Sequence, residues 1–148
     1  MATARSAVRP AQEQALLPKE IKLAMQGAIP AFICTCSLDG VPNATIISQV
    51  YYVDSRHIAL SCQFFNKTTR NARENPFVSI LLIETEAYDE WYLEARYDHS
   101  ETEGPVFDEM DMQIEAIASM TGMSGVFKLK SADVYEVLAV ERRSAMNG

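Results

Sequence analysis

Three short apolar segments separated by tight turns constrain the fold more than any other feature of this sequence. The segments Ala31–Ser37, Ala44–Val53 and His57–Gln63 are rich in β-branched and aromatic residues, which is typical of β-strands. Turn signals at residues 39–40 and 54–55 separate them, and connections this short join antiparallel neighbours. The sequence therefore predicts an antiparallel meander and argues against a doubly wound parallel sheet.

Further strands and helices are predicted on either side of this meander. Helices are expected over Pro18–Gly27, over a basic segment that begins at Lys67, and over Val106–Met120; strands are expected over Phe77–Thr85, Glu90–His99, Val126–Lys130 and Val134–Val140, with a turn over Ser131–Asp133. We therefore predict a mainly β fold of six or seven antiparallel strands with two or three peripheral helices, arranged as a closed or half-open barrel. Residues 1–17 are interpreted as a flexible N-terminal arm and residues 18–148 as a single domain.

The composition argues against two classes of partner. A net charge of −7 is not that of a protein whose main partner is nucleic acid or an anionic membrane. No apolar run approaches the roughly 20 residues that a membrane-spanning helix needs. Residues 1–17 carry no apolar stretch like that of a signal peptide, so we expect a cytoplasmic protein that binds neither membrane nor nucleic acid.

The cysteines and histidines do not form a recognisable metal motif. The cysteines Cys34, Cys36 and Cys62 are odd in number, and the two histidines, His57 and His99, are distant in sequence from Cys34 and Cys36 and from each other. We therefore expect no metal site and no disulfide framework. The thiols are interpreted as buried side chains that pack as small hydrophobes.

The segment Ser61–Pro76 combines the end of a strand with the start of a basic helix. Asn66 is suited to cap a helix, and Lys67 with the two following threonines would form its first turn. A helix start presents unpaired N–H groups and partial positive charge, to which Lys67, Arg70 and Arg73 add full charges. From these residues two interpretations stay open: a binding site for an anion such as phosphate, and a solvated basic helix without a ligand.

No catalytic set of side chains can be recognised in the sequence. There is no Ser-His-Asp or Cys-His arrangement and no glycine-rich phosphate loop, and the acidic residues cluster around expected loops. A scaffold that holds a phosphate but lacks an acid–base set usually leaves the chemistry to a cofactor.

Four sequence motifs together resemble the FMN-binding split β-barrel proteins related to pyridoxamine 5′-phosphate oxidase. They are the Asp-Gly turn followed by Pro-Asn-Ala at 42–44, the segment F-F-N-K-T-T-R-N-A-R-E-N-P at 64–76, S-E-T-E-G-P-V-F at 100–107 and V-F-K-L-K-S-A-D-V-Y-E-V at 126–137. The resemblance covers about Ala28 to Glu141. It implies a split β-barrel, FMN as cofactor, and a homodimer that holds flavin in a cleft between its subunits.

The resemblance also implies a set of cofactor-binding residues. Lys67 and Thr68 would meet the flavin phosphate, Thr45, Ile46, Ile47 and Ser48 would line the ring and the ribityl chain, and Ser61 and Cys62 would flank the same cleft. To these we add Gln49 and Gln63, whose amides could bond the polar edge of the ring, and Trp91 as a contact from the dimer partner.

Three positions depart from the pattern of the oxidases. Thr45 stands where they carry a phosphate-binding arginine, Thr68 where they carry a second basic residue, and Glu90 where they carry a glutamine that touches flavin. Losing one arginine–phosphate bridge removes about 1.5–3 kcal/mol, so we expect weaker FMN binding or compensation by Arg70. The contacts that the oxidases make to their vitamin substrate through a C-terminal arginine and histidine have no counterpart, so we do not expect oxidation of pyridoxamine phosphate.

The sequence leaves three hypotheses about function. The first is a flavin-dependent oxidoreductase that uses a small-molecule electron donor or acceptor. The alternative is a non-catalytic flavin- or haem-binding module for sensing or storage, in which only His57 or His99 could supply an imidazole ligand to haem iron. The third is a deazaflavin-dependent reductase built on the same barrel.

Overall fold

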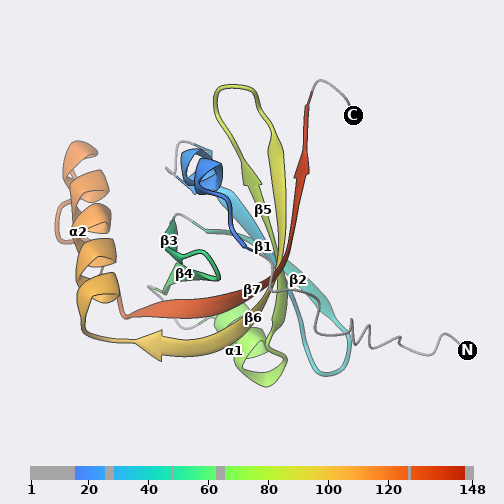
Figure 1. The fold of residues 1–148 in the computed structure, drawn as a ribbon. Coiled ribbons are helices and arrows are strands. Elements are labelled where there is room, and N and C mark those ends of the chain that lie inside the picture. Colours follow the sequence, from blue (N-terminus) through green and yellow to red (C-terminus); the bar gives the residue numbers. More distant parts are fainter. Residues whose placement is uncertain (1–15, 26–28, 48, 63–65, 127, 146–148) are drawn as a thin grey trace, which may run out of the picture.

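The computed structural model describes residues 16–25, 29–47, 49–62, 66–126 and 128–145, in which strands alternate with three helices. In chain order the elements are the 3₁₀-helix η1 (Lys19–Met25), β1 (Ala31–Cys36), β2 (Pro42–Ile47), β3 (Val50–Asp54), β4 (His57–Cys62), α1 (Lys67–Glu74), β5 (Phe77–Ile83), β6 (Glu90–Glu101), α2 (Pro105–Met120) and β7 (Ser131–Arg143). The long helix α2 lies beside β3 and β4, whereas α1 lies at another end of the sheet (Figure 1). In the part of the chain that is described, no helix is long and apolar enough to cross a membrane.

All strand pairs in the sheet are antiparallel. Its 7 strands follow the order β2-β1-β5-β6-β7-β4-β3, which leaves β2 and β3 as the edges. The sheet is therefore open, with the curvature of a split barrel, and the predicted mainly β class with antiparallel strands and peripheral helices is confirmed.

The strands β6 and β7 form the bent spine of this sheet (Figure 1). Their register shifts between Glu94 and Ala95 and again between Tyr97 and His99. Such β-bulges increase local twist and let long strands bend, so one strand pair can serve both halves of the barrel. The largest buried side chains, which fill the interior, are Ile21, Ile33, Ile58, Ile80, Leu82, Leu93 and Met110.

The prediction of one strand over Ala44–Val53 is wrong. The chain leaves β2 after Ile47 and begins β3 at Val50, and these two strands lie at opposite edges of the sheet. β2 pairs with β1, whereas β3 pairs with β4, so the predicted meander is interrupted between them. The β-branched and aromatic residues on both sides of Ser48 and Gln49 suit either strand equally, and two polar residues alone do not reveal that the chain changes edges.

The predicted structure before and within the last strand is also wrong. Val126 and Lys130 lie outside any strand, and Ser131–Asp133 is the beginning of β7 rather than a turn. These three residues pair with Cys62, Ser61 and Leu60 of β4. Tertiary pairing therefore overrides the turn preference of serine and aspartate.

The expectation that all three thiols are buried is wrong in part. Cys34 is exposed and Cys36 partly exposed on the outer face of β1, so of the three thiols only Cys62 is buried as predicted. Leu17, the last residue of the predicted arm, packs in the core, and its N–H donates to Ser55 O at 2.6 Å. The division into an arm and a single domain otherwise stays a prediction.

Candidate functional site

Helix α1 begins and ends where the sequence predicts. The Asn66 side chain caps its start, because Oδ1 accepts hydrogen bonds from the Thr69 N–H at 3.0 Å and from Thr69 Oγ1 at 3.2 Å. Asn75 closes the other end, immediately before Pro76. The first-turn N–H groups of Lys67 and Thr68 have no acceptor within the helix, as at any helix start.

A chain of side-chain hydrogen bonds fixes α1 against β1 and β2. Thr35 Oγ1 accepts from Asn71 Nδ2 at 3.1 Å and from Asn43 Nδ2 at 3.4 Å, and Asn43 Nδ2 also lies 3.0 Å from Thr68 Oγ1. Thr35 and Asn71 are both buried. Because the Thr68 hydroxyl accepts from Asn43, its own hydrogen is left to donate to a ligand.

A pocket of about 410 Å³ opens between β2, β4 and the start of α1. Its volume falls within the range of about 300–1,000 Å³ that small-molecule sites occupy. The lining residues are Pro30, Ile33, Thr45, Ile46, Ile47, Leu60, Ser61, Cys62, Asn66, Thr68, Thr69, Asp133 and Tyr135. The lining thus combines apolar side chains from the strands with polar side chains from the start of α1 and from β2, β4 and β7.

The structure brings many of the predicted cofactor-binding residues to this pocket. Those that line it are Thr45, Ile46, Ile47, Ser61, Cys62 and Thr68. Lys67 and Arg70 are exposed on α1 without lining the pocket, and Lys67 directly precedes Thr68. Ser48 and Gln63 lie outside the described residues. Binding of a cofactor by any of them stays a prediction.

Gln49 and Trp91 lie away from the pocket lining. The buried Gln49 amide donates from Nε2 to Gln113 Oε1 of α2 at 2.5 Å, while its own Oε1 is buried without a hydrogen-bond partner. Trp91 is buried in the core of its own chain, with the Arg142 guanidinium 4.9 Å from its ring centroid. Contact between Trp91 and a cofactor in another subunit would require this packing to open.

Sequence reasoning missed the two polar residues that β7 contributes to the pocket. Asp133 is only 6% exposed, and its Oδ1 accepts from Ser100 Oγ at 2.7 Å and from Ser131 Oγ at 2.8 Å. Burial, and then the Asp133 charge, raise the pKa of Tyr135 above its ordinary value, so its phenol stays neutral. The available signal was an aspartate directly before the strand-like segment at 134–140, which the interpretation of Ser131–Asp133 as a turn concealed.

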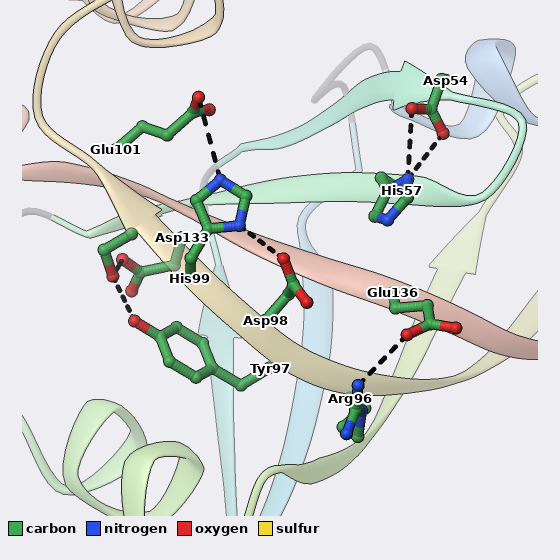
Figure 2. A network of polar contacts seen from close by, with 10 residues as sticks. Asp54, His57, Arg96, Tyr97, Asp98, His99, Glu101, Asp133 and Glu136 are labelled. Atoms are coloured by element: carbon green, nitrogen blue, oxygen red, sulfur yellow. Dashed lines mark hydrogen bonds and ion pairs between the residues drawn. The ribbon is translucent and has the colours of Figure 1, made fainter.

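Both histidines are engaged with carboxylates on the surface. His57 Nδ1 lies 2.9 Å from Asp54 Oδ1, and His99 Nδ1 lies 2.5 Å from Asp98 Oδ2 (Figure 2). His99 Nε2 lies 3.8 Å from Glu101. Neither ring lines the pocket, and among the described residues no group of three or more potential ligands could hold a metal ion.

The curved open sheet, with a pocket and a capped helix start at its rim, defines a split β-barrel. The chain belongs to the pyridoxamine 5′-phosphate oxidase family, whose model matches residues 17–138. No curated protein matches the sequence.

Several solved structures share this fold. An FMN-binding protein from Syntrophomonas wolfei subsp. wolfei is 17% identical, with a TM-score of 0.70 over 83% of this chain and 82% of that one. The heme storage protein HutZ from Vibrio cholerae is 18% identical, with a TM-score of 0.59 over 90% and 99% of the two chains. An F420 reductase is 12% identical, with a TM-score of 0.60 over 84% and 98%. At these identities the likeness shows the fold alone.

Proposed function

We propose that the protein binds FMN in the pocket between β2, β4 and α1 and acts as a flavin-dependent oxidoreductase. The observation that carries this proposal is the pocket itself, which joins the polar first turn of a capped helix to a largely apolar slot between two strands. FMN has the same division, with a phosphate at one end and a flat ring at the other.

The first turn of α1 fits the phosphate. Thr68 lines the pocket with a hydroxyl that is free to donate, and the N–H groups at the helix start carry partial positive charge. Lys67, one residue earlier, adds a mobile full charge beside the rim. Since Thr45 offers no charge, Lys67 and Arg70 are the cations proposed to neutralise the phosphate.

The slot between the strands fits the ring. Ile33, Ile47 and Leu60 supply apolar surface on its two sides. Such surface would exclude water from one face of a flavin, while the polar atoms of the lining orient it. FMN, when bound, supplies hydride chemistry, and the chain's own residues bind and orient it. The electron donor or acceptor is proposed to be a small molecule.

We further propose that two copies form a homodimer through the outer face of β2, β1 and β5. Phe32 pairs with Ile46 on one side and with Leu81 on the other, so these apolar side chains form a row across three strands. Ile46 is 62% exposed and also lines the pocket, so a second copy on this face would complete the pocket wall. Replacing Phe32→Glu should convert a dimer to a monomer in light scattering; a monomeric wild type would contradict this proposal.

The competing function is a non-catalytic module that stores or senses flavin or haem. It is supported by the lack of a recognisable acid–base pair among the lining residues and by the likeness of the fold to a heme storage protein. Against haem, neither histidine lines the pocket, so an imidazole ligand for its iron would have to come from elsewhere.

One titration separates these functions. The stripped protein is titrated in parallel with FMN, haemin and a deazaflavin while its visible spectrum is recorded, and the loaded protein is then mixed with NADH or NADPH. Flavin binding followed by oxidation of the nicotinamide supports the oxidoreductase, whereas bound flavin that no donor reduces supports the storage module. Lack of FMN binding at about 100 μM would overturn the proposal, because sites of this kind bind in the micromolar range or tighter.

A further inference from the structure

We propose that Asp133 is a specificity-determining residue of the pocket, where its carboxylate accepts a hydrogen bond from a hydroxyl or N–H group of the bound flavin. This inference rests on the proposed function and adds a lining residue that faces the ligand from β7.

The carboxylate is buried, tethered and incompletely satisfied. Asp133 lines the pocket while only 6% exposed, and both of its hydrogen bonds end on Oδ1. Among the described residues, the second oxygen, Oδ2, accepts no hydrogen bond. Oδ2 is not itself a fully buried atom without a partner, so it is open to the pocket and can accept a hydrogen bond from a ligand in exchange for water.

A relay of hydroxyls holds the carboxylate in place. Ser100 Oγ donates its hydrogen to Asp133, so the Tyr97 phenol, 2.5 Å from Ser100 Oγ, donates in turn to Ser100. In Figure 2 the Tyr97 phenol points toward the Asp133 carboxylate. The Tyr97 ring also packs edge-on against Tyr135, with 5.6 Å between centroids. The acceptor is therefore positioned before any ligand arrives.

This arrangement is not needed merely to join the strands. Ser100 and Asp133 are already paired in the backbone ladder of β6 and β7, which extends from Glu90 to Glu101 on β6. The buried charge therefore adds a feature that the ladder does not require. A carboxylate in the lining repels anionic groups beside it, so it favours a ligand that turns an uncharged hydroxyl or N–H group toward β7.

The test compares FMN binding by the wild type, Asp133→Asn and the control Asp98→Asn. The control makes the same change of charge on β6, at an exposed residue that does not line the pocket. We expect Asp133→Asn to weaken FMN binding about tenfold, as loss of a hydrogen bond to a charged group does, and Asp98→Asn to leave it unchanged. Quenching of flavin fluorescence measures the FMN affinity of each variant and of the wild type.

Two flavin analogues separate recognition from a structural role. One is 3-methyl-FMN, which lacks the ring N–H, and the other carries a phosphopentyl chain without ribityl hydroxyls. The analogue that lacks the recognised donor should bind the wild type and Asp133→Asn with equal affinity. The other analogue should, like FMN, bind Asp133→Asn about tenfold more weakly than it binds the wild type. A structural defect would instead weaken all three ligands alike, which would overturn the inference.

The outcomes also distinguish this inference from the proposed function. A wild type that binds no FMN overturns both, whereas equal FMN binding by wild type and Asp133→Asn overturns only the role of Asp133. Should Asp133→Asn fail to fold, Ser131→Ala removes one tether and keeps the charge. That variant should bind FMN about threefold more weakly, and an unchanged affinity would again overturn the inference.

Discussion

The two α-helices are attached to the same sheet by different kinds of interaction. Helix α1 is held by side-chain hydrogen bonds that run from Asn71 through Thr35 and Asn43 to Thr68. Helix α2 is held mainly by Met110, Ile114 and Ala118, which are buried on its inner face. Hydrogen bonds depend on direction, whereas apolar burial does not. The difference indicates that polar contacts fix the direction of α1 on the sheet, whereas apolar burial, with hydrogen bonds from Gln49 and Tyr51, holds α2 over it.

The largest effect is expected from Met110→Ala, which removes the central apolar contact of α2. Met110 is 0% exposed, so the change should lower the free energy of unfolding by about 2–5 kcal/mol in urea titrations. Met112→Ala, on the same helix at a residue that is 69% exposed, should stay within about 0.5 kcal/mol. If α2 only covers the sheet, the folded fraction of Met110→Ala should keep its affinity for FMN; a loss would show that α2 also shapes the pocket.

A smaller effect, on stability and binding together, is expected from Thr35→Val. The change leaves the buried Asn71 amide without its acceptor, which should cost about 1–3 kcal/mol of unfolding free energy. Because the start of α1 is then less well fixed, FMN binding should weaken as well. The double variant with Thr68→Val should lose less affinity than the sum of the single changes; strict additivity would argue against one connected network.

Lys67→Ala should change binding without changing stability. Lys67 is exposed at the start of α1, so we expect about tenfold weaker FMN binding, or about 1.4 kcal/mol, with an unfolding transition like that of the wild type. The control Lys19→Ala removes the same charge from η1, at a residue outside the pocket lining. It should change neither the affinity for FMN nor the unfolding transition. Equal FMN affinity in the two variants would rule out the phosphate assignment.

The smallest effect is expected from Tyr51→Phe, which removes a polar link between β3 and α2. The Tyr51 hydroxyl donates to Glu109 Oε2 at 2.6 Å, and loss of this exposed bond should cost about 1 kcal/mol or less. Burial and then the hydrogen bond to Glu109 raise the pKa of Tyr51 from 10.0 to about 12.

The same variant makes a prediction about pH. Because the folded state retains the Tyr51 proton to higher pH than the unfolded state does, this residue stabilises the fold below about pH 10 and loses that contribution as the pH rises toward about 12. Urea unfolding at pH values from about 8 to 11 should therefore show a shallower alkaline loss for Tyr51→Phe than for the wild type. An identical slope would show that the link to Glu109 does not affect this titration.

The sequence predicts well those structural features that contiguous residues determine. Asn66 and Pro76 mark the limits of α1 by local chemistry, and the same short segment predicts the polar rim of the pocket. Asp133 could not be predicted in this way, since its conformation depends on Ser100 of β6 and on pairing with Leu60 of β4. The break between β2 and β3 was missed for the same reason, because strand partners distant in sequence decide which edge each strand joins.

That break limits how far the barrel can open. β2 ends at Ile47 and β3 begins at Val50, so three peptide units join the two edges of the sheet. At 3.8 Å between consecutive Cα atoms, the ends of these strands can never be more than roughly 11 Å apart, whatever happens to the hydrogen bonds around them. The covalent link across the seam therefore keeps the ends of β2 and β3 close together, and a wide opening of the sheet between these two ends would need the chain to be cut.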